Sequence, residues 1–133
     1  MSEPTKVIAS SVNDDELSCG CLTKLMTLRV ALLERKSFEQ KENITVTSNA
    51  VKVQARIRKS RLKLKVGESM SLHDVAIGML MCEGGGLATL LAEHATSSLD
   101  DFVKRMNEEA SRLGMSHTRF VDPHGLSSEN VST

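Results

Sequence analysis

Residues 22–33 are apolar at most positions, and neither Pro nor Gly interrupts them. The apolar side chains recur at three- and four-residue steps and also fill much of the remaining circumference of a helix. A helix that is apolar nearly all round is typical of a buried element. The sequence therefore predicts a central, buried helix, which ends at the charged run Glu34-Arg35-Lys36.

Residues 51–66 follow a different pattern, in which apolar and basic positions mostly alternate. A period of two favours a strand or an extended segment with one solvated face. The preceding residues 44–47 include β-branched side chains, which also favour extended structure. A short β-type run is expected at residues 6–9.

Two further helices are predicted from capping pairs, Ser71 with Asp74 and Ser98 with Asp101. Gly114 is the expected end of the second helix, and three consecutive glycines at 84–86 are expected to end one helix and start another. The expected buried positions of the two capped helices are Leu72, Val75, Ala76, Met79 and Leu80 in the first, and Phe102, Met106, Ala110 and Leu113 in the second.

The length of 133 residues predicts a single domain, 1–133, with one modest core. The formal net charge of zero gives no global electrostatic argument for binding nucleic acid or an anionic membrane. No apolar run approaches the roughly 20 residues of a membrane span. Residues 1–13 also lack the basic start and apolar block of a secretory signal. We expect neither a nucleic-acid partner nor a membrane span.

A thiol and an amine, Cys21 and Lys24, lie three residues apart at the entry of the predicted central helix. This spacing is expected to place both side chains on one helix face. A nucleophile followed three residues later by Lys is the arrangement of the active-site-serine acyl transferases, in which Lys assists deprotonation of Ser.

The surrounding residues resemble the D-alanyl-D-alanine carboxypeptidases, the small penicillin-binding proteins of serine peptidase family S11. That family reads Ala-Ser-Leu-Thr-Lys-Leu-Met-Thr where this chain has Gly20-Cys21 followed by Leu-Thr-Lys-Leu-Met-Thr. Three further segments resemble the family in the same order, namely residues 64–68, Ala92-Glu93-His94 and the run 116–126 that ends in Asp-Pro-His-Gly-Leu. The resemblance covers residues 17–133. Residues 1–16 are then a polar N-terminal remnant, in which 7–14 would be left from the family's second strand.

The resemblance implies a mainly α fold with an α+β remnant: the helical part of the penicillin-binding, β-lactamase-like transpeptidase fold without most of its five-stranded sheet. It places Cys21 at the nucleophile position and Lys24 at the base position. Glu83 falls where the family has the Ser of its Ser-Gly-Asn motif, and Gly85 falls where it has the Asn. The family's Lys-Thr-Gly motif does not occur in this sequence.

We therefore expect a homologue of the peptidoglycan carboxypeptidases that is truncated and catalytically inactive, a pseudoenzyme. If active, it would take peptidoglycan peptides ending in D-Ala-D-Ala. No cofactor or metal is expected, because no His or Cys spacing is typical of a metal site. The family works outside the cytoplasmic membrane, yet no signal peptide is visible, so the resemblance leaves the location open.

Several alternatives stay open. Glu83 is interpreted as a salt-bridge partner that keeps Lys24 protonated, and Cys82 could form a disulfide with Cys19 or Cys21 in the family's arrangement. Without the sheet, the 22–33 helix is expected to expose apolar surface and self-associate. The alternative function is a non-enzymatic module that binds an anionic polymer through the basic stretch 52–65, which otherwise is a solvated face.

Overall fold

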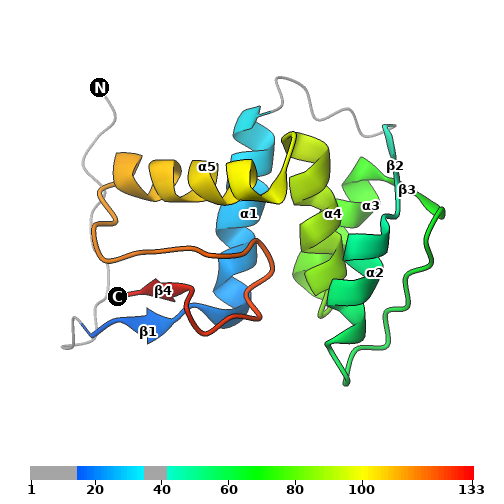
Figure 1. Ribbon diagram of the computed structural model, residues 1–133, viewed down its shortest axis with the longest axis horizontal. Coiled ribbons are helices and arrows are strands. Elements are labelled where there is room, and N and C mark those ends of the chain that lie inside the picture. Colours follow the sequence, from blue (N-terminus) through cyan, green and yellow to red (C-terminus); the bar gives the residue numbers. More distant parts are fainter. Residues whose placement is uncertain (1–14, 35–41) are drawn as a thin grey trace.

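The computed structural model describes residues 15–34 and 42–133 (Figure 1). The helices within these ranges are α1 (Thr23–Glu34), α2 (Ser48–Ala55), α3 (Leu72–Met81), α4 (Gly85–Ala95) and α5 (Leu99–Arg112). The strands are β1 (Leu17–Ser18), β2 (Asn43–Thr45), β3 (Ser69–Ser71) and β4 (Val131–Ser132). The strand expected at residues 6–9, or 7–14 by resemblance, lies outside the described residues.

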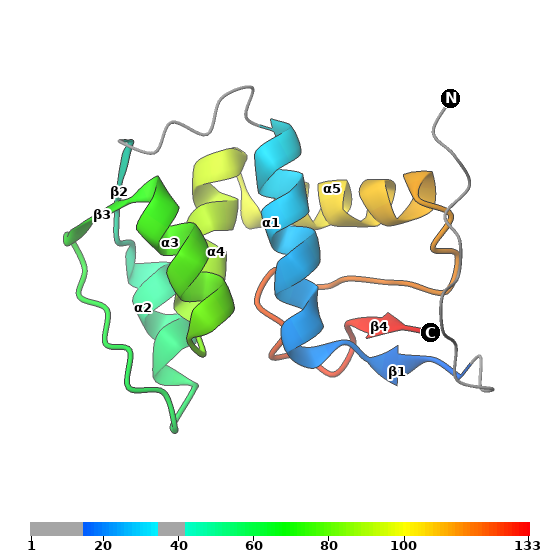
Figure 2. The same ribbon diagram turned by 180° about the vertical axis from the view of Figure 1, so that it is seen from behind.

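The strands form two separate antiparallel pairs rather than one large sheet within the described residues. β1 pairs with β4, so that Leu17 lies opposite Ser132, and β2 pairs with β3, so that Ile44 lies opposite Met70. Both views show α2, α3 and α4 on one side of α1, with α5 and the β1–β4 pair on the other (Figures 1 and 2). The predicted mainly helical fold with little sheet is confirmed.

The centre of the core is α4 rather than the helix expected from the sequence. Residues 85–92 of α4 are all buried, and α4 packs against α1, α2, α3 and α5. Close packing against α2 depends on Gly86, because a Cβ there would lie 2.5 Å from the carbonyl oxygen of Ala50. The three-glycine junction thus starts α4 and also lets it approach its neighbour.

The prediction that residues 22–33 are buried all round is wrong. One face of α1 is in the core through Met26 and Val30, whereas Leu22, Leu25 and Leu33 are 69%, 58% and 56% exposed. Burial of the second face needs a covering element, and the described part of the chain provides none there. The exposed apolar surface expected from the sequence is therefore confirmed.

The prediction of a strand over residues 51–66 is wrong in its first half. Residues 48–55 form α2, whose start is capped by Thr47: its hydroxyl oxygen accepts a hydrogen bond from Ala50 N at 3.2 Å. The alternation does persist further on, since Leu62 and Leu64 pack against the core while residues 61, 63 and 65 are exposed. The extended structure expected at 44–47 is confirmed by β2 at its start.

The two predicted helix caps are confirmed. Ser71 Oγ accepts from Asp74 N at 3.0 Å, and Ser98 Oγ accepts from Asp101 N at 3.1 Å. Leu80 and Leu113, expected on the buried stripes, are instead 41% and 44% exposed. None of the helices in the described ranges has the length and apolarity that crossing a membrane requires.

Candidate active site

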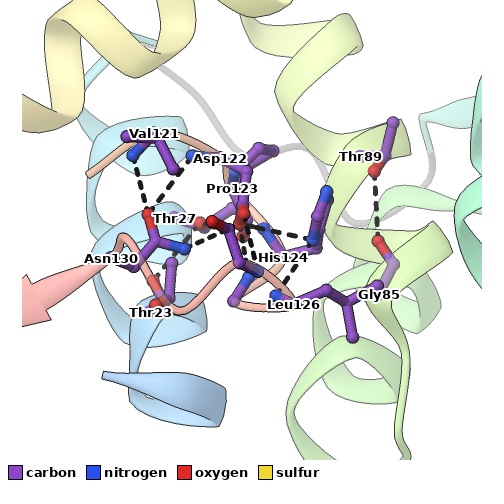
Figure 3. Close-up of polar contacts among 12 residues, drawn as sticks. Thr23, Thr27, Gly85, Thr89, Val121, Asp122, Pro123, His124, Leu126 and Asn130 are labelled. Carbon is purple, nitrogen blue, oxygen red and sulfur yellow. Dashed lines mark hydrogen bonds and ion pairs between the residues drawn. The ribbon is translucent and has the colours of Figure 1, made fainter. Parts of the chain in front are cut away.

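Three segments that are distant in the sequence meet beside the first turn of α1. They are the entry to α1, the junction between α3 and α4, and the loop 121–130, which lies between α1 and α4 (Figure 3). A Cβ on Gly125 of this loop would overlap the carbonyl oxygen of Gly20 and lie 3.2 Å from Thr23 Cβ. A Cβ on Gly85 would lie 3.6 Å from His124 Cβ. The fold therefore brings the segments that carry the expected site residues into one region.

The loop is organised around the carboxylate of Asp122. Its Oδ1 accepts hydrogen bonds from His124 N at 3.0 Å, Gly125 N at 2.6 Å and Asn130 Nδ2 at 2.8 Å. Its Oδ2 accepts from Ser127 N at 3.1 Å. An ionised carboxylate with several N–H donors fixes the backbone of a loop because each charge-assisted bond is stronger than a neutral one.

One further contact holds this loop against α1, and another closes the loop between its two ends. Thr27 Oγ1 donates to the carbonyl oxygen of Pro123 at 2.6 Å, and the buried Asn130 accepts from Val121 N at 2.7 Å. Gly125 has a φ of +79°, which side-chain-bearing residues rarely adopt. The Asp-Pro-His-Gly-Leu run is thus a fixed wall of the site.

His124 is the titratable group of this wall. Burial lowers its pKa below the ordinary value; the carboxylate of Asp122 opposes this, and the charges of Arg56 and Lys24 add to the lowering. The Nδ1 atom accepts a hydrogen bond from Leu126 N at 3.2 Å. The same Nδ1 atom also lies 3.3 Å from Asp122 Oδ1, so a backbone N–H group and a carboxylate both approach this nitrogen.

Cys21 and Lys24 differ in their environments. The Cys21 side chain is exposed in the 3-10 turn Gly20–Leu22 that leads into α1, whereas Lys24 is 6% exposed in the first turn of the helix. Within the described residues, the structure shows no hydrogen bond or ion pair for the Lys24 ammonium. The charge of Lys24 acts on His124, and Lys24 has no fixed acidic partner from the described chain.

The three cysteines are free thiols, so neither of the disulfides left open by the sequence is formed. Cys82 is exposed, as is Cys21, whereas Cys19 is partly buried. Burial raises the pKa of the Cys19 thiol. The exposed Cys21 is therefore the thiol that a reagent reaches at the entry of α1.

The residues of the α3–α4 junction lie at the positions of the Ser-Gly-Asn motif but differ in their surroundings. Glu83 is exposed, and among the described residues it forms no ion pair, so the interpretation of a salt bridge to Lys24 is wrong. Gly85 is buried at the start of α4. A Cβ there would lie 2.9 Å from Ile57 Cδ1, so the space beside Gly85 is already filled by an apolar side chain.

Sequence reasoning missed Gln54, which holds this junction in place. Its buried carboxamide donates from Nε2 to the carbonyl oxygen of Glu83 at 3.0 Å and to Ser60 Oγ at 2.8 Å. Its Oε1 accepts from Gly86 N at 3.0 Å. Gln54 was missed because the alternating pattern predicted a strand. The available signal was Thr47, a capping residue followed by a long run without Pro or Gly.

The chain is similar to known proteins over nearly its whole length. A family model described as D-alanyl-D-alanine carboxypeptidase matches residues 2–133. The D-alanyl-D-alanine endopeptidase of Escherichia coli is 35% identical over 130 residues, covering 96% of this chain and 40% of the relative. That of Pseudomonas aeruginosa is 34% identical over 128 residues, with the same two coverages. The chain thus spans 40% of the length of these two relatives.

Solved structures share the fold. Penicillin binding protein 6B from Escherichia coli superposes with a TM-score of 0.83 at 25% identity, covering 96% of this chain and 42% of that one. The Streptomyces K15 DD-transpeptidase also superposes with a TM-score of 0.83, at 24% identity, covering 95% of this chain and 50% of that one. From the match to the family model over residues 2–133, we conclude that this chain belongs to the D-alanyl-D-alanine carboxypeptidase family, peptidase family S11.

Proposed function

We propose that this chain keeps the scaffold of a D-alanyl-D-alanine carboxypeptidase of cell-wall metabolism but does not catalyse the reaction. The observation that carries the proposal is Gly85. The family's Asn at this position would hold the substrate amide, whereas here no side chain exists and Ile57 fills the space. A carboxamide could occupy that space only after Ile57 had moved.

The changed nucleophile supports the same conclusion. Acyl transfer by Cys21 requires a thiolate as the nucleophile. Attack also requires the sulfur atom to reach the carbonyl carbon in line. A longer C–S bond and a larger atom displace the attacking atom in a site whose geometry tolerates errors of about 1 Å at most.

The proton relay is also altered. Where the family has a second Ser, this chain has Glu83, whose side chain is exposed. The junction backbone is nevertheless held by Gln54, so the loop keeps its place while losing the hydroxyl group. General acid–base steps contribute about 10²–10⁴-fold to a rate, and losses among groups that act together are not additive.

The test is release of D-alanine from a peptide ending in D-Ala-D-Ala. We expect no release above the rate without protein, for the chain as it is and for Cys21→Ala. Turnover by the unchanged chain that disappears in Cys21→Ala would contradict the proposal. The gain-of-function comparison is a variant that restores the family's residues at three positions, through Cys21→Ser, Glu83→Ser and Gly85→Asn.

We also propose that the exposed face of α1 promotes self-association. A groove of about 500 Å³ beside this face is lined mainly by apolar residues, among them Leu17, Leu22 and Leu25. Burying one such side chain is worth about 1.5–3 kcal/mol. Sedimentation velocity over a range of concentrations tests this, with Leu25→Gln as the variant expected to be more monomeric. A single monomeric species at all concentrations would contradict it.

A further inference from the structure

One stretch of the chain carries only positive charge. Residues 52–65 contain seven cationic side chains and no Asp or Glu. All seven are exposed, and none forms an ion pair with another residue of the described part of the chain. We name this set the basic face, which consists of Lys52, Arg56, Arg58, Lys59, Arg61, Lys63 and Lys65.

The fold arranges the basic face in two rows. Lys52 and Arg56 are one helical turn apart at the end of α2. Arg61, Lys63 and Lys65 alternate along the segment that follows, which runs in an extended path beside α2 (Figure 1). Alternate residues of an extended chain are about 6.6 Å apart. The segment therefore presents a row of evenly spaced cations.

Side chains of the same two elements that point into the protein hold the two rows of cations in place. Leu64 is in the core and Leu62 packs against it, which turns the intervening basic side chains outward. Gln54 donates to Ser60 Oγ at 2.8 Å and thereby ties the start of the segment to α2. A hollow of about 310 Å³ opens between the two elements, with Arg58 and Lys63 among its lining residues.

The chemistry of the face selects among anionic partners. The sequence has neither Trp nor Tyr, and its three Phe lie outside residues 52–65, so nucleic-acid bases have no aromatic ring there on which to stack. An amphipathic element that inserts into a membrane surface carries large apolar side chains beside its cations. Leu62 and Leu64 are turned inward here, which leaves Val66 as the exposed large apolar residue at the end of the segment.

We infer that the basic face binds a linear polymer of repeating phosphate groups through charge alone. Such a chain carries anionic groups at a regular spacing and offers nothing that needs stacking or apolar burial. The inference is independent of catalysis, because none of the seven side chains is among the expected catalytic groups. It nevertheless concerns the same region, since Ile57 lies against Gly85 and the charge of Arg56 acts on His124.

The test is binding of long-chain inorganic polyphosphate, measured by titration calorimetry between 50 and 200 mM salt. Each engaged cation on a flexible polyanion releases about 0.7 counterion, so five to seven contacts predict a loss of affinity of roughly 100- to 1000-fold over this range. The triple variant Arg61→Gln, Lys63→Gln, Lys65→Gln should lower the slope of log K against log salt by about 2. The matched control changes Lys104, Arg105 and Arg119 to Gln, which removes the same charge from exposed positions elsewhere.

An equal loss of affinity in the control would overturn the inference, because binding would then follow net charge. Affinity that does not change with salt would overturn it as well. Binding to vesicles of anionic phospholipid without binding to polyphosphate would assign the face to a membrane surface instead. Thermal unfolding checks that the variants fold. If the triple variant unfolds, Lys63→Gln alone should lower the slope by about 0.7, and an unchanged slope would overturn the inference.

Discussion

The loop 121–130 and the α3–α4 junction border the same site but differ in what their side chains do. In the loop, the carboxylate of Asp122 receives four hydrogen bonds, and the backbone at Gly125 fits against the entry of α1. In the junction, the backbone is held by Gln54, but Glu83 is exposed and Gly85 has no side chain. The loop carries side chains that hold its own structure, whereas neither Glu83 nor Gly85 provides a bonded side chain to the junction.

The difference has a physical reason. A side chain that bonds only to a substrate contributes little to folding, so its loss leaves stability almost unchanged. A buried acceptor such as Asp122 leaves several donors unpaired when it is removed. Removal of the Asp122 carboxylate should therefore lower the free energy of unfolding, whereas removal of the exposed Glu83 side chain should not.

The largest effect is expected for Gly125→Ala. The new Cβ would be strained at a φ of +79° and would also overlap the carbonyl oxygen of Gly20, for a combined loss of about 3 kcal/mol or more. Urea unfolding measures it. Gly114→Ala is the matched control, since its φ is +75° with open space around it, and we expect about 1 kcal/mol. Equal losses would show that contact with Gly20 is not important.

The next largest effect is expected for Asp122→Ala, because it leaves the N–H groups of residues 124, 125 and 127 without their acceptor. The loss should be about 2–4 kcal/mol. Asp122→Asn keeps one acceptor oxygen and should lose less. A change below about 0.5 kcal/mol for Asp122→Ala would mean that the loop does not depend on this carboxylate.

A smaller effect is expected for Gly85→Asn in the junction. The new side chain must displace Ile57, and overpacking of this kind typically destabilises by about 1–3 kcal/mol. Combining it with Ile57→Ala should recover part of the loss, as a double-mutant cycle would measure. Strict additivity of the two changes would contradict the contact between these positions.

The smallest effect is expected for Glu83→Ser. Glu83 is exposed, and only its backbone is bound, so the free energy of unfolding should change by less than about 0.5 kcal/mol. Chemical denaturation of the unchanged chain and of Glu83→Ser under the same conditions measures this difference. A loss above about 1 kcal/mol would show that the Glu83 side chain has a structural role.

The sequence predicted those parts of the fold that local interactions decide. The caps at Ser71 and Ser98 depend on a bond three residues along the chain, and both are present. The sequence did not predict α2, because the alternation of apolar and basic residues over 51–66 begins inside this helix and is typical of a strand. The exposure of Leu25 could not be derived from its helix alone, because burial depends on a covering element from elsewhere.

In the candidate site, too, sequence motifs located some residues, whereas the roles of others depend on the assembled fold. Cys21, Lys24 and Glu83 were located by resemblance to the family motifs. The roles of Gln54 and Ile57 depend on contacts across about thirty residues of sequence, which no local pattern specifies. The unpaired ammonium of Lys24 likewise follows only from the assembled fold, within its described part.

The central claim is that the scaffold is kept and the acyl-transfer chemistry is lost. Intact-mass spectrometry after incubation with a penicillin tests it most directly, because a covalent adduct requires only the first acylation step. We predict no adduct on the unchanged chain. A stoichiometric adduct that disappears in Cys21→Ala would contradict the claim, because it would show that the Cys21 thiol still performs the first acylation step.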